Sequence, residues 1–210
     1  MIYIYNELRA WQGAIGSGLG FLALFLGAFW NFHLNRRRDA HLRDEEVASV
    51  AAALYGELLL LRRAVGRLAT RYAQHYIDVG VGRTRREIDS YFIDDTRLPE
   101  SQIYNALVSK IGMLPPDVVL AIVSFHANAE RAQAYLSKMA PDEKRGFNYS
   151  PLYVLEASRD AVVDVLPTLE RLAMIAGIRN GNHEVLLGKT DTVIEMERES
   201  WDQLMSDSED

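Results

Sequence analysis

The sequence predicts an all-α protein, in which one N-terminal transmembrane helix continues into a long amphipathic helix and a helical bundle follows. Three observations support this fold class. Residues 10–35 form a run of 26 without a charged side chain. Apolar residues then recur at three- and four-residue steps, the period of helices that bury one face. The 210 residues are 49% hydrophobic and 25% charged, which suits one globular domain with appendages.

The predicted transmembrane helix covers residues 11–35, after an extracytoplasmic N-terminus of residues 1–10. About 20 helical residues cross a hydrocarbon core of about 30 Å, whereas buried core helices rarely keep an apolar run beyond about 14 residues. No basic leader and no small-x-small cleavage site mark the run as a signal peptide. Aromatic residues flank both ends, as they do at membrane interfaces: Tyr3, Tyr5, Trp11, Phe29, Trp30 and Phe32.

Basic residues around this run predict its orientation. Arg9 alone precedes it, whereas Arg36, Arg37 and Arg38 follow it directly. Because Lys and Arg concentrate on the cytoplasmic side, we expect the N-terminus outside and the rest of the chain in the cytoplasm.

The glycines of the run form a pattern of their own. Residues with the smallest side chains follow each other at alternating steps of three and four: Gly13, Gly16, Gly20, Ala23 and Gly27. Small residues in one seam allow helices in lipid to approach closely, so the seam predicts a homo-oligomer. The alternative is that glycine is simply common in spans, as Gly18 off the seam illustrates.

A long amphipathic helix is predicted from residue 39 to about 78, ending at Gly80 and Gly82. No proline separates it from the span, so the two helices can be one. The apolar stripe contains Val47, Val50, Leu54, Leu58, Leu61, Val65, Leu68, Tyr72 and Tyr76.

The predicted cytoplasmic helical domain, which includes this long helix, covers residues 36–180. Residues 83–98 read as a connector, and a helix is expected from about 99 to 112. Another helix begins at Pro115 and Pro116, where proline suits the first turn. A last long helix from 151 to about 178 is expected to kink at Pro167.

Residues 181–210 are predicted to be an acidic, mobile tail. From residue 189 onward there are eight acidic and two basic residues, which equals the net charge of −6 of the whole chain. We expect at most a marginal helix near residues 195–205. Removing residues 189–210 should then leave the thermal stability unchanged, unless Trp201 and Leu204 anchor the tail.

The junction Asn35–Arg36–Arg37–Arg38–Asp39 and the later Leu114–Pro115–Pro116 turn resemble those of bacterial single-span inner-membrane proteins of unknown function. That resemblance covers about 150 residues and implies a helical cytoplasmic domain, but no activity. The layout is also similar to small pore-forming membrane proteins that accompany some RNA-targeting CRISPR systems, which have a HEPN-like fold. This second likeness implies a pore-type effector, in a role such as phage defence.

The sequence contains no complete catalytic motif. There is no cysteine, and the five histidines lack metal-ligand spacing, so we expect no metal and no cofactor. HEPN nucleases use an arginine and a histidine separated by four to six residues. Arg36 and His41 match only at the membrane junction, and the weak candidates Arg179 and His183 are separated by three residues.

Two hypotheses follow from these observations. The first is a non-enzymatic single-pass protein of the bacterial inner membrane that forms oligomers through its span and its long helix. It would act as a scaffold or pore-type effector with an unknown cytoplasmic protein partner. The alternative is a membrane-tethered HEPN-like ribonuclease with Arg179 and His183 at its site. The neutral body and acidic tail do not indicate a nucleic-acid-binding surface.

Overall fold

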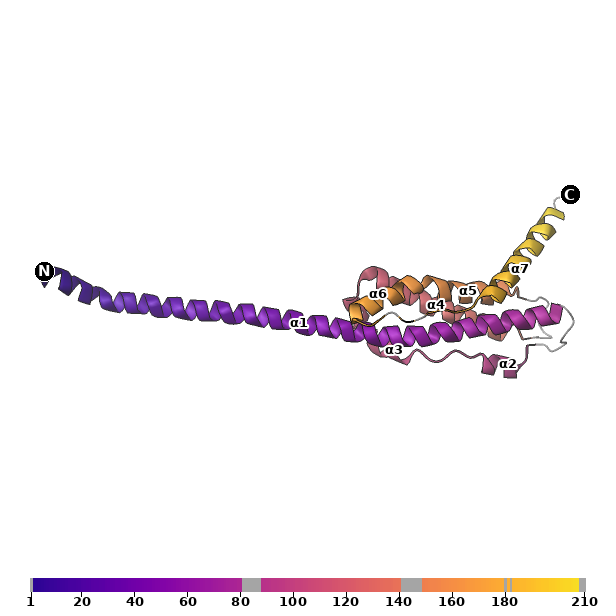
Figure 1. Ribbon diagram of the computed structural model, residues 1–210, viewed down its shortest axis with the longest axis horizontal. Helices are drawn as coiled ribbons and strands as arrows, with labels where there is room; N and C mark the ends of the chain where they lie inside the picture. The colour runs from indigo at the N-terminus through magenta and orange to yellow at the C-terminus, as the bar shows by residue number, and fades with distance from the viewer. Residues whose placement is uncertain (1, 81–87, 141–148, 180, 182, 208–210) are drawn as a thin grey trace. The chain divides into compact units, whose positions relative to one another are not determined.

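The computed structural model describes the backbone of residues 2–80, 88–140, 149–179, 181 and 183–207. Side chains are described for the same residues except 2–15, 18 and 207. Every regular element in this part of the chain is a helix (Figure 1). The all-α prediction is therefore confirmed.

Helix α1 runs from Ile2 to Gly80 without a break. It ends at the glycine expected to stop it, while Gly82 lies outside the described residues. By its contacts the chain divides into two compact units, residues 1–46 and 47–210, and α1 contributes to both.

The N-terminal unit consists of α1 alone. In the part of the chain with described side chains, no helix combines the length and the apolarity needed to cross a membrane. The predicted span of residues 11–35 includes residues 11–15 and 18, whose side chains lie outside that part. The transmembrane helix therefore gains no support here and stays a prediction.

The C-terminal unit buries the amphipathic stripe of α1 against helices that follow it. Seven of the nine predicted stripe residues are buried, and Val47 and Tyr76 are partly buried. The stripe packs against α4 (Pro116–Lys138), α5 (Leu152–Asp164) and α6 (Leu166–Ala176). Helix α4 begins at Pro116, where the sequence predicted a helix start. Burial of these apolar faces holds the bundle together.

Three short elements lie between α1 and α4, where the sequence predicted a connector and one helix. The connector contains α2 (Ser90–Asp95), whose first turn is capped because the amide of Phe92 donates to Asp89 Oδ1 at 2.8 Å. The single helix expected over residues 99–112 is instead α3 (Gln102–Leu107) and a 3-10 turn, η1 (Ile111–Met113). The buried carboxylate of Glu57 in α1 accepts hydrogen bonds from the amides of Ile103 and Tyr104 and so caps the first turn of α3. Helix α3 therefore begins later than predicted, and the prediction of one helix was wrong.

The last predicted long helix is interrupted at Val165, two residues before Pro167. Proline lacks an amide hydrogen and its ring crowds the carbonyl of the preceding turn, which explains the break. Helix α6 then ends at Gly177, which adopts the left-handed conformation (φ 65°).

The acidic tail contains a helix, and this corrects the sequence prediction. Helix α7 extends from Gly188 to Asp207, where at most a marginal helix was expected. Its first half packs on α5, with Val193 and Ile194 buried. The expected anchors Trp201 and Leu204 are instead 52% and 61% exposed. Two adjacent apolar residues in an acidic segment were too weak a signal to predict this docking.

Candidate functional site

The two residues of the predicted pair, Arg179 and His183, differ in their surroundings. Arg179 is exposed, whereas His183 is half-buried against α1. There the Nε2 atom of His183 lies 3.4 Å from the hydroxyl oxygen of Tyr55, and the two rings meet edge-on. Burial and the charges of Arg62 and Arg63 lower the pKa of His183 and so favour its neutral form.

Arg62 lies beside His183 and is buried, with only 3% of its surface exposed. Its Nε donates to the carbonyl oxygen of Val162 at 2.7 Å, and its Nη1 donates to the carbonyl oxygen of His183. Val162 lies in the last turn of α5, where carbonyl groups lack partners inside the helix and a positive charge is favourable. Burial lowers the pKa of Arg62, and the neighbouring charge of Arg63 adds to this. Arg62 therefore ties α5 and the segment before α7 to α1.

Sequence reasoning missed Arg62 although a signal was present. On a helical wheel, Arg62 falls within the apolar stripe of α1, in a row with Leu58 and Val65. A charged residue inside such a stripe predicts a buried hydrogen-bonded group.

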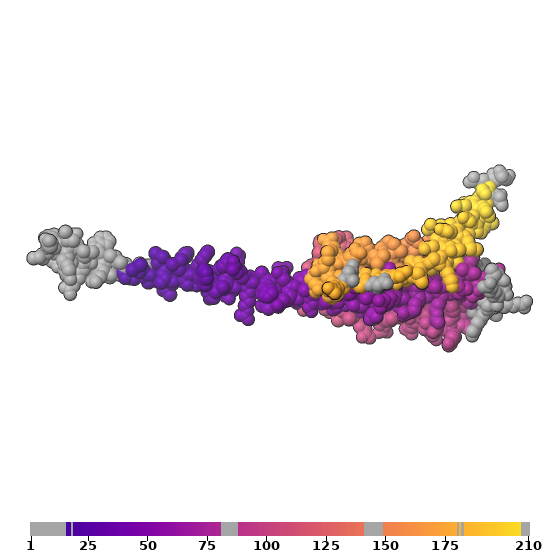
Figure 2. All heavy atoms as spheres, viewed as in Figure 1, coloured from indigo at the N-terminus to yellow at the C-terminus, as the bar shows by residue number. Residues whose placement is uncertain are grey.

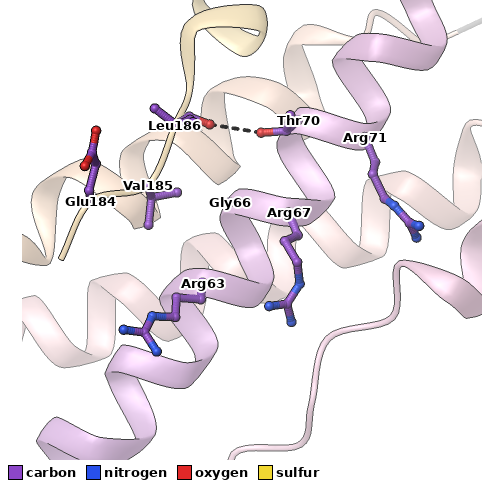
Figure 3. Close-up of a pocket in the computed structure, with 8 residues that line it drawn as sticks. All are labelled: Arg63, Gly66, Arg67, Thr70, Arg71, Glu184, Val185 and Leu186. Atoms are coloured by element: carbon purple, nitrogen blue, oxygen red, sulfur yellow. Dashed lines mark hydrogen bonds between the residues drawn. The ribbon is translucent and has the colours of Figure 1, made fainter. Parts of the chain in front are cut away.

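A second cluster lines a groove of about 420 Å³ between α1 and residues 184–186 (Figure 3). We call it the arginine groove. Arg63, Arg67 and Arg71 follow each other on successive turns of α1, and the hydroxyl of Thr70 donates to the carbonyl oxygen of Leu186 at 3.0 Å. The groove is lined by Arg63, Gly66, Arg67, Thr70, Arg71, Glu184, Val185 and Leu186.

Gly66 determines how closely the two walls of the groove approach. A Cβ atom at this position would overlap Cγ1 of Val185, and Figure 3 shows Val185 facing Gly66. Only a residue without a side chain lets the 184–186 segment lie against α1 here.

The chain matches no protein-family model, no curated protein and no solved structure.

The charges along the arginine groove are unevenly balanced. Arg71 forms an ion pair with Asp95 of α2. Within the described side chains, Arg63 and Arg67 have no carboxylate at ion-pair distance. A neighbouring hollow of about 300 Å³ shares Arg67 and Arg71 and adds Arg97, which extends the positive surface toward α2.

A third cluster surrounds His126 of α4. His126 is 6% exposed, and its ring stacks on that of Tyr104 with the ring centroids 4.0 Å apart. Ser101 Oγ lies 3.1 Å from Nδ1, while Nε2 is buried without a hydrogen bond to any described residue. Burial lowers the pKa of His126 to about 4, so the imidazole is neutral at pH 7.

The contact between Ser101 and His126 does not make a complete nucleophilic site. A working serine nucleophile needs a basic histidine that a third group orients and donors for the developing oxyanion. Here the imidazole has lost basicity, and no described group hydrogen-bonds to its other nitrogen. We interpret the pair as packing at the wall of a hollow of about 300 Å³.

The remaining sequence-predicted residues belong to the N-terminal unit. Gly16, Gly20 and Gly27 face open space, Ala23 is exposed, and the side-chain surroundings of Gly13 lie outside the described part. The guanidinium of Arg36 lies 4.8 Å from the ring centroid of Phe32, while Arg37 and Arg38 are exposed. Nothing lies within 4 Å of a Cβ atom placed at the three described glycines of the seam, so the role of the seam stays a prediction.

Among the residues with described side chains, no three His, Asp or Glu residues are close enough to hold a metal ion.

Proposed function

We propose that this chain is a non-enzymatic scaffold of the bacterial inner membrane, anchored by residues 11–35 and self-associating through its span. One observation carries the proposal. Nine large apolar side chains between Leu19 and Phe32 are each more than half exposed on the bare helix of the N-terminal unit (Figure 2). They are Leu19, Phe21, Leu22, Leu24, Phe25, Leu26, Phe29, Trp30 and Phe32.

A helix that is apolar on every side needs lipid or other helices around it. At about 25 cal/mol per Å², leaving so many large side chains in water forgoes many kcal/mol. The uncharged run of the sequence extends this surface back to residue 10, and Arg36, Arg37 and Arg38 close it on the other side. Membrane lipid is the surrounding that best satisfies this pattern.

The long helix is less available for oligomerisation than its pattern suggested. Its apolar stripe packs inside the C-terminal unit of the same chain. The seam of Gly13, Gly16, Gly20, Ala23 and Gly27 is then the proposed contact between copies. In the pore-type version of the proposal, several spans surround an opening, and the C-terminal unit binds a cytoplasmic protein partner.

The test of the anchor is alkaline extraction of membranes from cells that make the full chain. We expect the protein to remain in the membrane pellet. Replacing both Leu22 and Phe25 with Arg should release it, because each charge near the bilayer centre costs about 2.5–3.5 kcal/mol. Leu42→Arg is the matched control, since Leu42 is also exposed but lies outside the uncharged run. Release of the unaltered chain from the membrane pellet would show that residues 11–35 do not anchor it.

Orientation is tested by fusions at the C-terminus. With the C-terminal unit in the cytoplasm, a green fluorescent fusion should glow and an alkaline phosphatase fusion should be inactive. Active phosphatase would reverse the proposed topology.

A further inference from the structure

The arginine groove concentrates positive charge in a chain whose net charge is −6. Residues 58–77 of α1 include four arginines and no acidic residue. Arg63, Arg67 and Arg71 lie four residues apart, and like charges at that spacing repel each other and destabilise a helix. Arg71 is paired with Asp95, but Arg63 and Arg67 are exposed and have no carboxylate at ion-pair distance within the described side chains. An anion bound in the groove would relieve this repulsion.

The surroundings of the groove add to its positive potential. Arg62, next to Arg63, is buried and donates to backbone carbonyl oxygens, which do not neutralise its charge. The pKa of His183 is lowered by burial and, after that, by the charges of Arg62 and Arg63. Charges that are partly removed from water act more strongly on a ligand than fully solvated ones. The groove therefore favours an anionic ligand.

The arrangement of the arginines indicates what kind of anion fits. Figure 3 shows the three guanidinium groups one after another along α1 instead of converging on one point. From Arg63 to Arg71 the helix rises by about 12 Å. The neighbouring hollow shares Arg67 and Arg71 and adds Arg97, so the positive row continues beyond the groove. Such a row suits a chain of anionic groups better than one isolated anion.

The size and the opposite wall of the groove narrow the ligand further. Its volume of about 420 Å³ is that of a site for one small molecule or for a short piece of a chain. The opposite wall presents Val185 and Leu186, which are apolar, and Leu186 is 76% exposed. A ligand with anionic groups along one side and flat apolar groups along the other satisfies both walls.

We propose that the arginine groove binds the phosphate backbone of a single-stranded nucleic acid. The planar guanidinium groups of Arg63 and Arg67 donate paired hydrogen bonds to successive phosphates, a geometry that arginine provides and lysine does not. The bases lie toward Val185 and Leu186. Because the contacts are made to phosphates, binding does not depend on base sequence. The net charge of the whole chain does not indicate this surface, since acidic residues elsewhere offset the arginines. The site lies in the C-terminal unit and does not depend on the membrane anchor.

The test measures how binding depends on salt. A labelled single-stranded RNA of about ten nucleotides, within the site sizes of single-strand binders, is titrated with the detergent-extracted full chain, and its fluorescence anisotropy is followed at several salt concentrations. Each phosphate contact adds about 0.7 to the slope of log affinity against log salt. Arg63→Gln together with Arg67→Gln should therefore lower the slope by about 1.4 and weaken binding at least about tenfold.

The matched control removes the same charge elsewhere. Arg43→Gln together with Arg131→Gln changes two exposed arginines that line neither the groove nor the neighbouring hollow, and should leave the slope unchanged. Arg63→Lys together with Arg67→Lys keeps both charges, so it should keep the slope and lose part of the affinity. Equal loss of slope in the groove and control variants would overturn the proposal.

Two competitors distinguish other occupants. A poly-glutamate peptide with the same number of charges should displace the RNA much less well than unlabelled RNA does, because carboxylates offer fewer acceptor oxygens than phosphates. Displacement at equal concentrations would overturn the proposal and assign the groove to an acidic protein segment. ATP supplies the same phosphate chemistry without a strand, and competition by ATP as strong as that by the RNA would assign the groove to a free nucleotide instead.

Discussion

Arg62 interrupts the apolar stripe of α1 with a charge, and its surroundings explain why the fold tolerates it. The guanidinium donates hydrogen bonds to two backbone carbonyl oxygens, those of Val162 and His183. Removing such a donor destabilises a protein by more than the hydrogen bonds themselves contribute, because the acceptors keep their desolvation penalty after the donor is removed.

Arg62→Ala should therefore lower the free energy of unfolding by about 2–4 kcal/mol. In a chain of this size the thermal midpoint would fall by about 10 °C. Arg63→Ala, one residue on and exposed, should change it by no more than about 0.5 kcal/mol. Equal effects of the two substitutions, measured by calorimetry of the extracted protein, would contradict the role of Arg62.

Gly66 and Gly56 give a matched comparison on one helix. Alanine is favoured over glycine in a helix by about 1 kcal/mol. At Gly56 the added methyl group meets nothing within 4 Å, so Gly56→Ala should stabilise the protein by about that amount. At Gly66 it would overlap Val185, and overpacking of about 1–3 kcal/mol should make Gly66→Ala destabilising. Thermal unfolding of both variants checks this, and a stabilised Gly66→Ala would show that residues 184–186 do not pack on α1.

His126 predicts a pH dependence of stability. Its pKa is about 4 in the folded chain and near 6.5 when unfolded, so the unfolded state binds the proton more readily. The stability that neutral His126 contributes is complete above pH 6.5 and is lost as the pH falls from there toward 4. At pH 5 the loss should be about 2 kcal/mol.

His126→Gln should remove most of this acid-induced loss between pH 7 and pH 5, as measured by denaturant unfolding at each pH. Glu100 and Glu130 line the same hollow and are unchanged in the variant. His183→Gln should remove less of this loss, because the pKa of His183 is also lowered but its side chain is only half-buried. If the free energy of unfolding of His126→Gln falls with pH as steeply as that of the unaltered protein, the imidazole is reached by water and is not desolvated as described.

At the scale of the element, α7 has two halves with different surroundings. The first half is part of the core through Val193 and Ile194. Burial of the Tyr76 hydroxyl and its hydrogen bond to Glu197 raise the pKa of Tyr76 to about 12, which keeps the phenol protonated as a donor to that half. The second half contributes exposed residues and no core contact.

Truncation after Gly188 should therefore lower the thermal midpoint by about 10 °C, since two buried aliphatic side chains are worth about 1.5–3 kcal/mol each. This reverses the expectation from the sequence, which treated residues 189–210 as dispensable. Truncation after Ser200 removes Trp201 and Leu204 but no buried residue, and should change the midpoint little. Equal midpoints for the two truncated proteins would contradict the docking of α7.

At the scale of the whole molecule, the two units differ in how their apolar residues are satisfied. The C-terminal unit covers its apolar stripe with its own helices, whereas the N-terminal unit leaves its apolar side chains bare. The proposed membrane and the neighbouring spans would cover them. Because of this difference, the glycine seam can be tested on a segment that lacks the helical bundle.

Gly20→Ile should weaken self-association of residues 1–40 in a membrane two-hybrid assay, because a large side chain in the seam separates the helix axes. Gly18→Ile, off the seam, should weaken it much less. The short segment is chosen so that the C-terminal unit contributes no contact. Equal signals from both variants and the unaltered segment would leave the glycines as ordinary helix residues.

The sequence by itself determined the helical class, the stripe of α1, the end of that helix at Gly80 and the start of α4 at Pro116. These features depend on periodicity and on the backbone limits of glycine and proline, which are local properties. Only the tertiary structure decided the break of residues 99–112, the docking of α7, and the partners of Arg62 and His183. Each of these depends on side chains far apart in the chain, such as Glu57 with residues 103 and 104, or Arg62 with Val162. A one-dimensional pattern shows which residues seek burial, but the packed fold selects what they meet.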